Sequence, residues 1–159
     1  MENGDVAAIF VAMADMLAIQ GENVHRILAY RRAAETISAL GRPLEAIWRA
    51  DELGTLPGIG KVLAAKIDEL MRTGSLEAYE KLREQVPAGV LDLLRVPGVG
   101  PKRAALFWHD LDVTSIEDLD RAAREGRLRA LPGLGSATEA RILEGIASLR
   151  SLPAKSDHA

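Results

Sequence analysis

The sequence predicts an all-α fold of two small helical modules, and three observations lead to this prediction. Only 4% of the residues are aromatic, and the abundant alanine and leucine residues lose little side-chain freedom in a helix. Apolar residues recur at helical spacing, as Phe10, Met13 and Leu17 do, and no stretch alternates as a strand would. Glycines and prolines interrupt these periodic stretches and mark their ends.

The same interruptions predict where each helix begins and ends. The longer predicted helices are 4–20, 23–40, 43–51, 60–72, 75–85 and 101–109. From the second of these, we expect Ile27, Leu28, Ile37 and Leu40 to face the core. One further helix follows the capping residues at 114–115. In the last helix, we expect Ser136 to be the cap and Glu139 its partner in a capping box.

A seam between the two modules is expected at residues 87–89, which contain a proline and a glycine. The sequence thus divides into modules 1–86 and 87–150 and a disordered tail, 151–159. The chain has 159 residues, no cysteine, no signal-peptide pattern and no apolar run long enough for a membrane span, so we expect a cytoplasmic protein. Its net charge of −3 argues mildly against a nucleic-acid partner unless the basic residues gather locally.

Three segments repeat the pattern apolar-Pro-Gly-apolar-Gly before a predicted helix: hairpin one (56–60), hairpin two (96–100) and hairpin three (131–135). Proline cannot continue a preceding helix, and the first glycine permits a backbone conformation closed to other residues. We expect the second glycine to admit a neighbouring backbone. The next helix would then present unpaired amides at its positive end, which favours a phosphate oxygen. This is the helix-hairpin-helix pattern, and it predicts DNA-backbone contacts at Gly58, Gly60, Gly98, Gly100, Gly133 and Gly135.

Basic residues at the helix starts strengthen the prediction for two of the hairpins. Lys61, Lys102 and Arg103 are placed for contacts that position DNA without reading its sequence. Hairpin three has no early lysine, and it could touch DNA or pack against a neighbouring module. Trp48 and Trp108 could stack on bases or pack in the core.

Three stretches together resemble the N-terminal part of a bacterial X-family DNA polymerase. They are GENVHRILAYRRAAETI (21–37), LPGIGKVLAAKIDELMRTGSLEAYEKL (56–82) and RVPGVGPKRAALFWHDLDVTSIEDL (95–119). The resemblance implies a lyase-like domain followed by a duplex-binding subdomain. That family's palm and histidine-rich phosphatase-type domain have no counterpart in this sequence, so we expect neither polymerase nor nuclease activity. The chain would be a stand-alone protein or a fragment.

The resemblance also implies sites in both modules. No cofactor would be required, but backbone carbonyls could hold Na⁺ or K⁺ against a DNA phosphate. These carbonyls belong to Gly54, Leu56, Ile59, Leu94, Val96 and Val99. Lys66 stands at the position of the family's Schiff-base nucleophile, where it would attack C1′ of a 5′-deoxyribose phosphate; otherwise it is a surface lysine.

The predicted helix 23–40 supplies the candidate pocket for the 5′-phosphate. His25, Arg26 and Tyr30 stand where the family places phosphate ligands, and Arg31 adds another cation. Nearby cations would favour the neutral amine that nucleophilic attack requires. The other interpretation of this helix is an ordinary solvated basic face. The base for β-elimination is not identified, and Glu69 is a weak candidate.

Three interpretations of function remain open at this point. The first is a binder of gapped or nicked DNA in repair, without sequence preference and with possible 5′-deoxyribose phosphate lyase activity. The second is a DNA-binding scaffold that positions a polymerase palm or another repair protein. The third is a protein-interaction domain that has lost its affinity for DNA. The sequence does not identify the preferred lesion or the oligomeric state.

Overall fold

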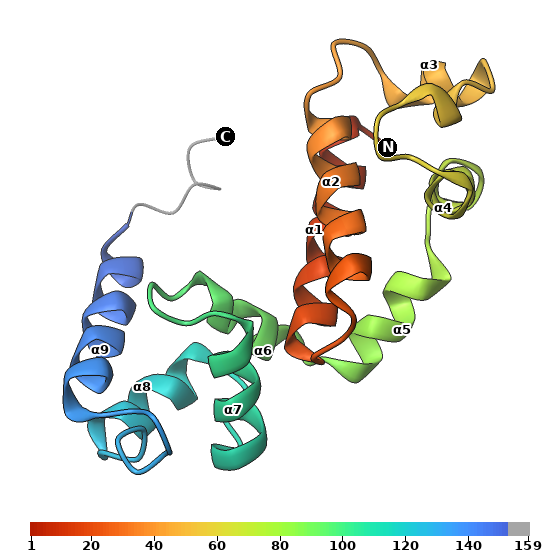
Figure 1. Ribbon diagram of the computed structural model, residues 1–159. Helices are drawn as coiled ribbons and strands as arrows, with labels where there is room; N and C mark the ends of the chain where they lie inside the picture. Colours follow the sequence, from red (N-terminus) through yellow and green to blue (C-terminus); the bar gives the residue numbers. More distant parts are fainter. Residues whose placement is uncertain (153–159) are drawn as a thin grey trace. The chain divides into compact units, whose positions relative to one another are not determined.

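The computed structural model describes residues 1–152, and every regular element in that part of the chain is a helix (Figure 1). The predicted all-α fold is therefore confirmed. The chain forms two compact units that divide after Val86. Of the tail predicted for 151–159, Ser151 ends the last helix and residues 153–159 lie outside the described part.

The first unit contains five α-helices and one 3₁₀ helix, all within the described residues. They are α1 (Asn3–Ile19), α2 (Val24–Ser38), α3 (Leu44–Arg49), η1 (Leu53–Thr55), α4 (Lys61–Thr73) and α5 (Glu77–Gln85). In the described part of the second unit, the elements are α6 (Ala88–Asp92), η2 (Leu93–Arg95), α7 (Pro101–Leu111), α8 (Ile116–Arg124) and α9 (Ser136–Ser151).

The long helices α1 and α2 lie side by side at the centre of the first unit (Figure 1). Buried residues occur on several sides of α1, and Phe10 meets Tyr30 of α2 edge-on with ring centroids 5.6 Å apart. The prediction that Leu28 faces the core is wrong, because this side chain is 54% exposed. Tyr30 lies on the buried face of α2. Leu28 is two positions earlier and therefore points about 200° away around the helix.

In the second unit, a glycine brings α6 directly against the loop before α8. A Cβ on Gly89 would lie 1.8 Å from the carbonyl oxygen of Thr114, so only glycine fits at this contact. The hydroxyl of Ser115 caps α8 by accepting from the amide of Asp118 at 3.0 Å. The amide of Thr114 in turn donates to the Asp118 carboxylate at 3.1 Å, which lowers the pKa of that carboxyl. The predicted cap at 114–115 is thus present.

The predicted capping box of the last helix is wrong. Gly135, with no capping side chain, is the N-cap of α9, and Ser136 is the first helical residue. Glu139 does not reach back to the cap, because its carboxylate is buried and bonded to the segment before hairpin three.

Candidate nucleic-acid interface

All three hairpins have the same backbone geometry. The first glycine of each turn, Gly58, Gly98 or Gly133, has a positive φ of 78°, 92° or 79°, which other residues adopt only with strain. One backbone hydrogen bond of 3.0–3.2 Å closes each turn. Its donors are the amides of Ile59, Val99 and Leu134, and its acceptors are the carbonyls of Leu56, Val96 and Leu131, respectively. The helices that follow, α4, α7 and α9, begin without a capping side chain, so their first amides remain available.

The second glycine of each turn does not have the role we predicted for it. No atom of the described chain lies within 4 Å of a Cβ built on Gly60, Gly100 or Gly135, so none of them admits a neighbouring backbone. Their φ values are also negative. The fold itself therefore gives no steric reason for glycine at these positions. At Gly60 and Gly100, close approach of a ligand to the helix start would give one.

Hairpins one and two also present carbonyl oxygens that suit a monovalent cation. The carbonyls of Leu56 and Val96 each accept the hydrogen bond across the turn. Within residues 1–152, those of Gly54, Ile59, Leu94 and Val99 accept no hydrogen bond. Neutral oxygen donors with free lone pairs are appropriate ligands for Na⁺ or K⁺, so these residues would fit the ion that the family resemblance implies.

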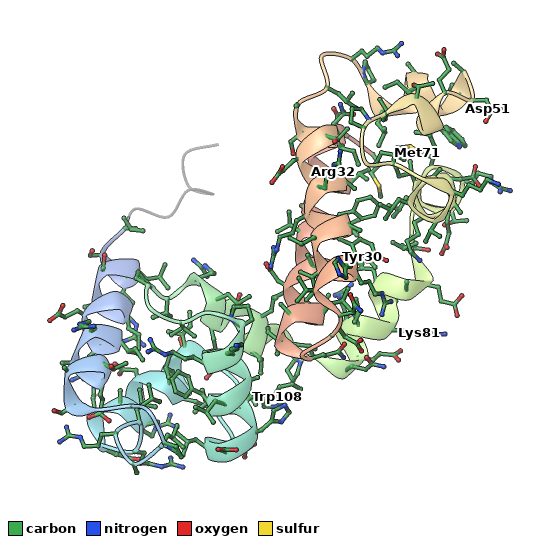
Figure 2. All side chains as sticks on the ribbon, viewed as in Figure 1. Tyr30, Arg32, Asp51, Met71, Lys81 and Trp108 are labelled. Atoms are coloured by element: carbon green, nitrogen blue, oxygen red, sulfur yellow. The ribbon has the colours of Figure 1, made fainter. Side chains whose placement is uncertain are left out.

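Helix α2 supports hairpin one from behind. The hydroxyl of Thr36 donates to the carbonyl of Pro57 at 2.8 Å. The side chain of Arg32, labelled in Figure 2, lies against Gly58, where a Cβ would be 3.0 Å from its Cγ. Neither Thr36 nor Arg32 was predicted to contact the turn. Their spacing of four residues on a predicted helix does place both on one face.

A pocket of about 430 Å³ lies between α2 and the start of α4. Three cationic side chains line it, those of Arg26, Lys61 and Lys66, together with Tyr30. The remaining described residues that line it are Gly58, Gly60, Ala29, Val62 and Leu63. No acidic side chain is among them, so the charged side chains at this pocket are all cationic, although the whole chain is acidic.

Tyr30 forms the buried wall of this cationic pocket. It is only 3% exposed, and this burial raises the pKa of its phenol, although Arg26 beside it acts in the opposite direction. A neutral phenol can donate a hydrogen bond, which makes Tyr30 suitable for holding an anion beside Arg26.

Two of the predicted phosphate ligands do not line this pocket. His25 lies exposed in the first turn of α2, where its amide donates to the side chain of Asn23 at 2.8 Å. Arg31 forms an ion pair with Asp15 at 2.9 Å and lines a different pocket, between α1 and α2. Because each helical residue turns by about 100°, Arg31, five positions after Arg26, points about 140° away from it around the helix.

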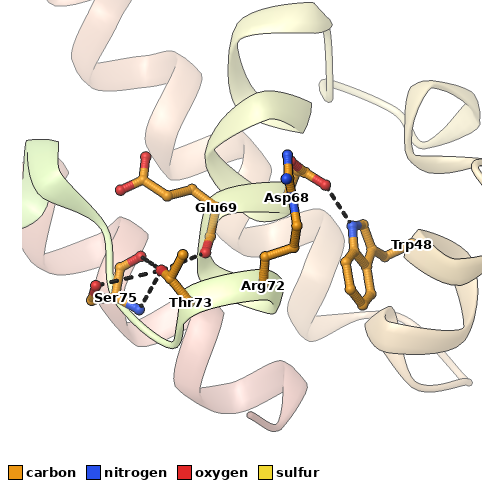
Figure 3. Close-up of polar contacts among 6 residues, drawn as sticks. All are labelled: Trp48, Asp68, Glu69, Arg72, Thr73 and Ser75. Carbon is orange, nitrogen blue, oxygen red and sulfur yellow. Dashed lines mark hydrogen bonds and ion pairs between the residues drawn. The ribbon is translucent and has the colours of Figure 1, made fainter.

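Glu69, the weak candidate for the elimination base, already has a structural partner. Its carboxylate accepts from the amide of Glu77 at 2.7 Å and so satisfies a donor at the start of α5. In Figure 3, Glu69 and Asp68 project to different sides of α4. The indole of Trp48 donates to Asp68 at 2.8 Å and connects α3 to α4. Arg72 also bonds to Asp68 and lowers the pKa of its carboxyl.

Hairpin two is held by its own helix rather than by a neighbour's side chain. The guanidinium of Arg103 donates to the carbonyl of Gly98 at 2.8 Å, so this predicted DNA ligand also stabilises the turn. Lys102 beside it is exposed. Trp108, farther along α7, is half-buried with its ring 4.4 Å from that of His109.

Descriptions of two known domains match most of the chain. A helix-hairpin-helix domain matches residues 1–76, and a SAM-like helix-hairpin-helix tandem matches residues 90–148. Both matches are to helix-hairpin-helix domains, one in each part of the chain. Within residues 1–152, no helix has both the length and the apolar character that a membrane crossing requires. Nor do three His, Cys, Asp or Glu side chains gather there as a metal site.

Several DNA polymerases are similar to this chain. The DNA polymerase/3'-5' exonuclease PolX of Bacillus subtilis (strain 168) is 29% identical over 153 residues, which are 96% of this chain and 26% of that protein. DNA polymerase lambda of Arabidopsis thaliana is 30% identical over 118 residues, 74% of this chain and 21% of that protein. DNA polymerase lambda of Rattus norvegicus is 28% identical over 102 residues, 64% of this chain and 17% of that protein.

The expected similarity to the N-terminal region of X-family polymerases is thereby confirmed. The chain spans only about a quarter of the length of the Bacillus subtilis protein and less of the two lambda polymerases.

Proposed function

We propose that this protein binds the phosphate backbone of gapped or nicked DNA through hairpins one and two, without reading base sequence. The observation that carries the proposal is the open geometry that the two turns share. Each presents unpaired helix-start amides beside a glycine with no neighbour within 4 Å. A Na⁺ or K⁺ ion on the turn carbonyls would add positive charge facing a phosphate. The names of the related polymerases support DNA as the partner.

The cationic pocket beside hairpin one supports a more specific activity, a 5′-deoxyribose phosphate lyase reaction at Lys66. Arg26 and Lys61 would hold the 5′-phosphate of the sugar through charged hydrogen bonds. Lys66 lines the same pocket, so its amine would be within reach of C1′ of the sugar that carries this phosphate.

The proposed reaction proceeds through an imine. The neutral amine of Lys66 adds to the C1′ aldehyde of the ring-opened sugar and loses water. Removal of a C2′ proton then forms the C2′–C3′ double bond, the C3′–O3′ bond breaks, and the downstream strand leaves with its 5′-phosphate. Water finally hydrolyses the imine and restores Lys66.

Borohydride trapping on an incised abasic duplex tests the reaction, because reduction fixes the imine as a covalent adduct. We expect an adduct with the wild type and with Lys61→Ala, and none with Lys66→Ala. Persistence of the adduct in Lys66→Ala would place the nucleophile elsewhere, with Lys61 the first suspect. Absence of an adduct in a wild-type protein that binds the duplex would remove the lyase activity and leave DNA binding.

One observation favours the alternative of a non-catalytic DNA-binding scaffold that positions a separate repair enzyme. No acidic side chain lines the pocket, and Glu69 is bonded to α5, so the described residues offer no evident base for the C2′ proton. For a scaffold, affinity would fall steeply with salt, by roughly 0.9 in log–log slope per phosphate contact, with no adduct formed.

A further inference from the structure

Hairpin three differs from the other two at a buried position of the helix that follows its turn. Counted from the first glycine of each turn, Glu139 occupies the place of Ala64 in hairpin one and Ala104 in hairpin two. Ala104 is fully buried, and Glu139 is only 2% exposed. A carboxylate is buried to this degree only when hydrogen bonds or a counter-charge compensate for the loss of water, so its partners indicate its role.

The partners of Glu139 are all in the segment before the turn. Its Oε2 accepts from the amides of Leu128 and Arg129, both at 3.1 Å. Its Oε1 accepts from Nε of Arg129 at 2.9 Å and lies 2.7 Å from Nη2 of the same guanidinium. Burial acts to raise the pKa of Glu139, but these donors outweigh it and hold the pKa below its usual value. The charged carboxylate therefore fastens this segment to α9.

The arginines that precede hairpin three are also neutralised by neighbours. Arg124 pairs with Asp120 at 3.1 Å, and Arg127 lies 3.8 Å from Glu125. Arg129 is occupied by Glu139. The first turn of α9, residues 136–139, carries no cation, whereas α7 begins with the exposed Lys102 directly after hairpin two.

Helix α9, which contains Glu139, packs directly against hairpin two. A Cβ on Gly145 of α9 would be 2.7 Å from the carbonyl oxygen of Pro97 and 3.3 Å from a side-chain carbon of Val96. Gly145 is buried, so backbone meets backbone at this point. Farther along α9, Arg150 reaches Asp120 of α8 at 3.6 Å. Helix α9 thus supports hairpin two from behind, as α2 supports hairpin one.

We infer that hairpin three braces hairpin two instead of gripping a DNA phosphate, and that Glu139 is the positioning residue of this brace. The inference rests on the proposed DNA binding by hairpin two. It gives the third copy of the motif a separate role: its turn starts α9 at the correct place, and Glu139 fixes that start.

A matched pair of glycine variants tests which turn receives DNA. Gly100→Ala and Gly135→Ala each add a methyl group at an N-cap, with negative φ and no described atom within 4 Å, so the cost to folding is similar and small. We expect affinity for a gapped duplex to fall roughly tenfold with Gly100→Ala, the scale of one charged hydrogen bond, and to change less than about twofold with Gly135→Ala. An equal loss with Gly135→Ala would overturn the inference.

Amide hydrogen exchange without DNA tests the brace independently of the proposed function. We expect Glu139→Gln to speed exchange at the hydrogen-bonded amides of Val96 and Val99 in hairpin two, and Glu144→Gln, an exposed site on the same helix, to leave them unchanged. In binding assays, Glu139→Gln should weaken affinity without altering the salt slope, because the phosphate contacts themselves remain.

Unchanged exchange at hairpin two in Glu139→Gln would overturn the positioning role. Should this variant unfold the second unit, Arg129→Met provides a milder version, because it removes the guanidinium but leaves both amide hydrogen bonds to Glu139. Faster exchange at hairpin two is expected there as well, and its absence would count against the brace in the same way.

Discussion

Hairpins one and two have the same backbone geometry but differ in the side chains that surround the turn. Hairpin one is held from outside by Thr36 of α2, whereas Arg103 of the helix that follows hairpin two bonds back to its own turn. Lys66 of α4 lines the cationic pocket beside hairpin one. The equivalent residue of α7, after hairpin two, is Leu106. The proposed phosphate contacts depend on the turn that both hairpins share, whereas the proposed lyase reaction also depends on Arg26 and Tyr30 of α2.

Exchanging these two residues gives the largest expected effect. Lys66→Leu should abolish the borohydride adduct, and Leu106→Lys should not create one in a protein that also carries Lys66→Leu, because hairpin two lacks the cations contributed by α2. Trapping on the incised abasic duplex measures both. An adduct formed at position 106 would show that a lysine beside either hairpin is sufficient.

The support behind hairpin two can be broken at Gly145. Gly145→Ala places a methyl group 2.7 Å from a backbone oxygen, and we expect it to cost the second unit about 1–3 kcal/mol of unfolding free energy, as overpacking does. Gly41→Ala, where nothing lies within 4 Å, is the control for the added methyl group. Urea unfolding measures both variants. Equal stabilities would mean that α9 does not press on hairpin two.

Acid should destabilise the second unit through its buried carboxylate. Because the pKa of Glu139 is below 4.5 in the folded state, the unfolded chain binds a proton first as the pH falls. The stabilisation is therefore complete above about pH 5 and is lost as the pH falls through the folded pKa. Hydrogen bonds to a charged group suggest a loss of at most about 2 kcal/mol.

Urea titrations at pH 7 and pH 3 check this loss. Glu139→Gln should be less sensitive to acid than the wild type. The same pH dependence in both proteins would assign the effect to other carboxyls, of which Asp118 is the first candidate because its pKa is also lowered.

The smallest expected effect concerns the support behind hairpin one. Thr36→Val removes the hydroxyl that donates to Pro57 but keeps the shape of the side chain, and we expect the first unit to lose about 1 kcal/mol of unfolding free energy. Thr55→Val, which removes a hydroxyl bond within a single turn of chain, is the comparison. A Thr36→Val protein as stable as the wild type would indicate that α2 supports hairpin one by packing alone.

Most of the fold could be predicted from the sequence because its signals are local. Helical periodicity and turn glycines depend on neighbouring residues, so the helices and the three hairpins were predicted correctly. Side-chain directions were harder: the position of Leu28 depends on which face of α2 the tertiary core selects. The role of Glu139 could not be predicted either, because its partners lie ten and eleven residues earlier and meet it only after the turn has formed.

The candidate site was predicted in part for the same reason. Arg26 and Tyr30 were predicted as phosphate ligands, Lys61 as a backbone contact and Lys66 as the nucleophile, and the structure brings all four into one pocket. His25 was grouped with them through the family resemblance and Arg31 as a nearby cation, and neither lines this pocket. Arg32 was missed as a neighbour of Gly58 because its contact is with backbone, for which the sequence carries no side-chain signal.

The contact between Gly89 and Thr114 has a consequence for how the second unit forms. It closes a loop of about 25 residues that contains all of hairpin two and α7. The entropy of closing this loop must be lost before the contact can form, so hairpin two is expected to become ordered late, together with the return of the chain to α6. A shortened fragment that ends at α7 would lack this closure. A fragment intended to keep hairpin two in its native form should therefore include Thr114. It should also extend through α9, because Gly145 of α9 contacts Pro97 of this hairpin.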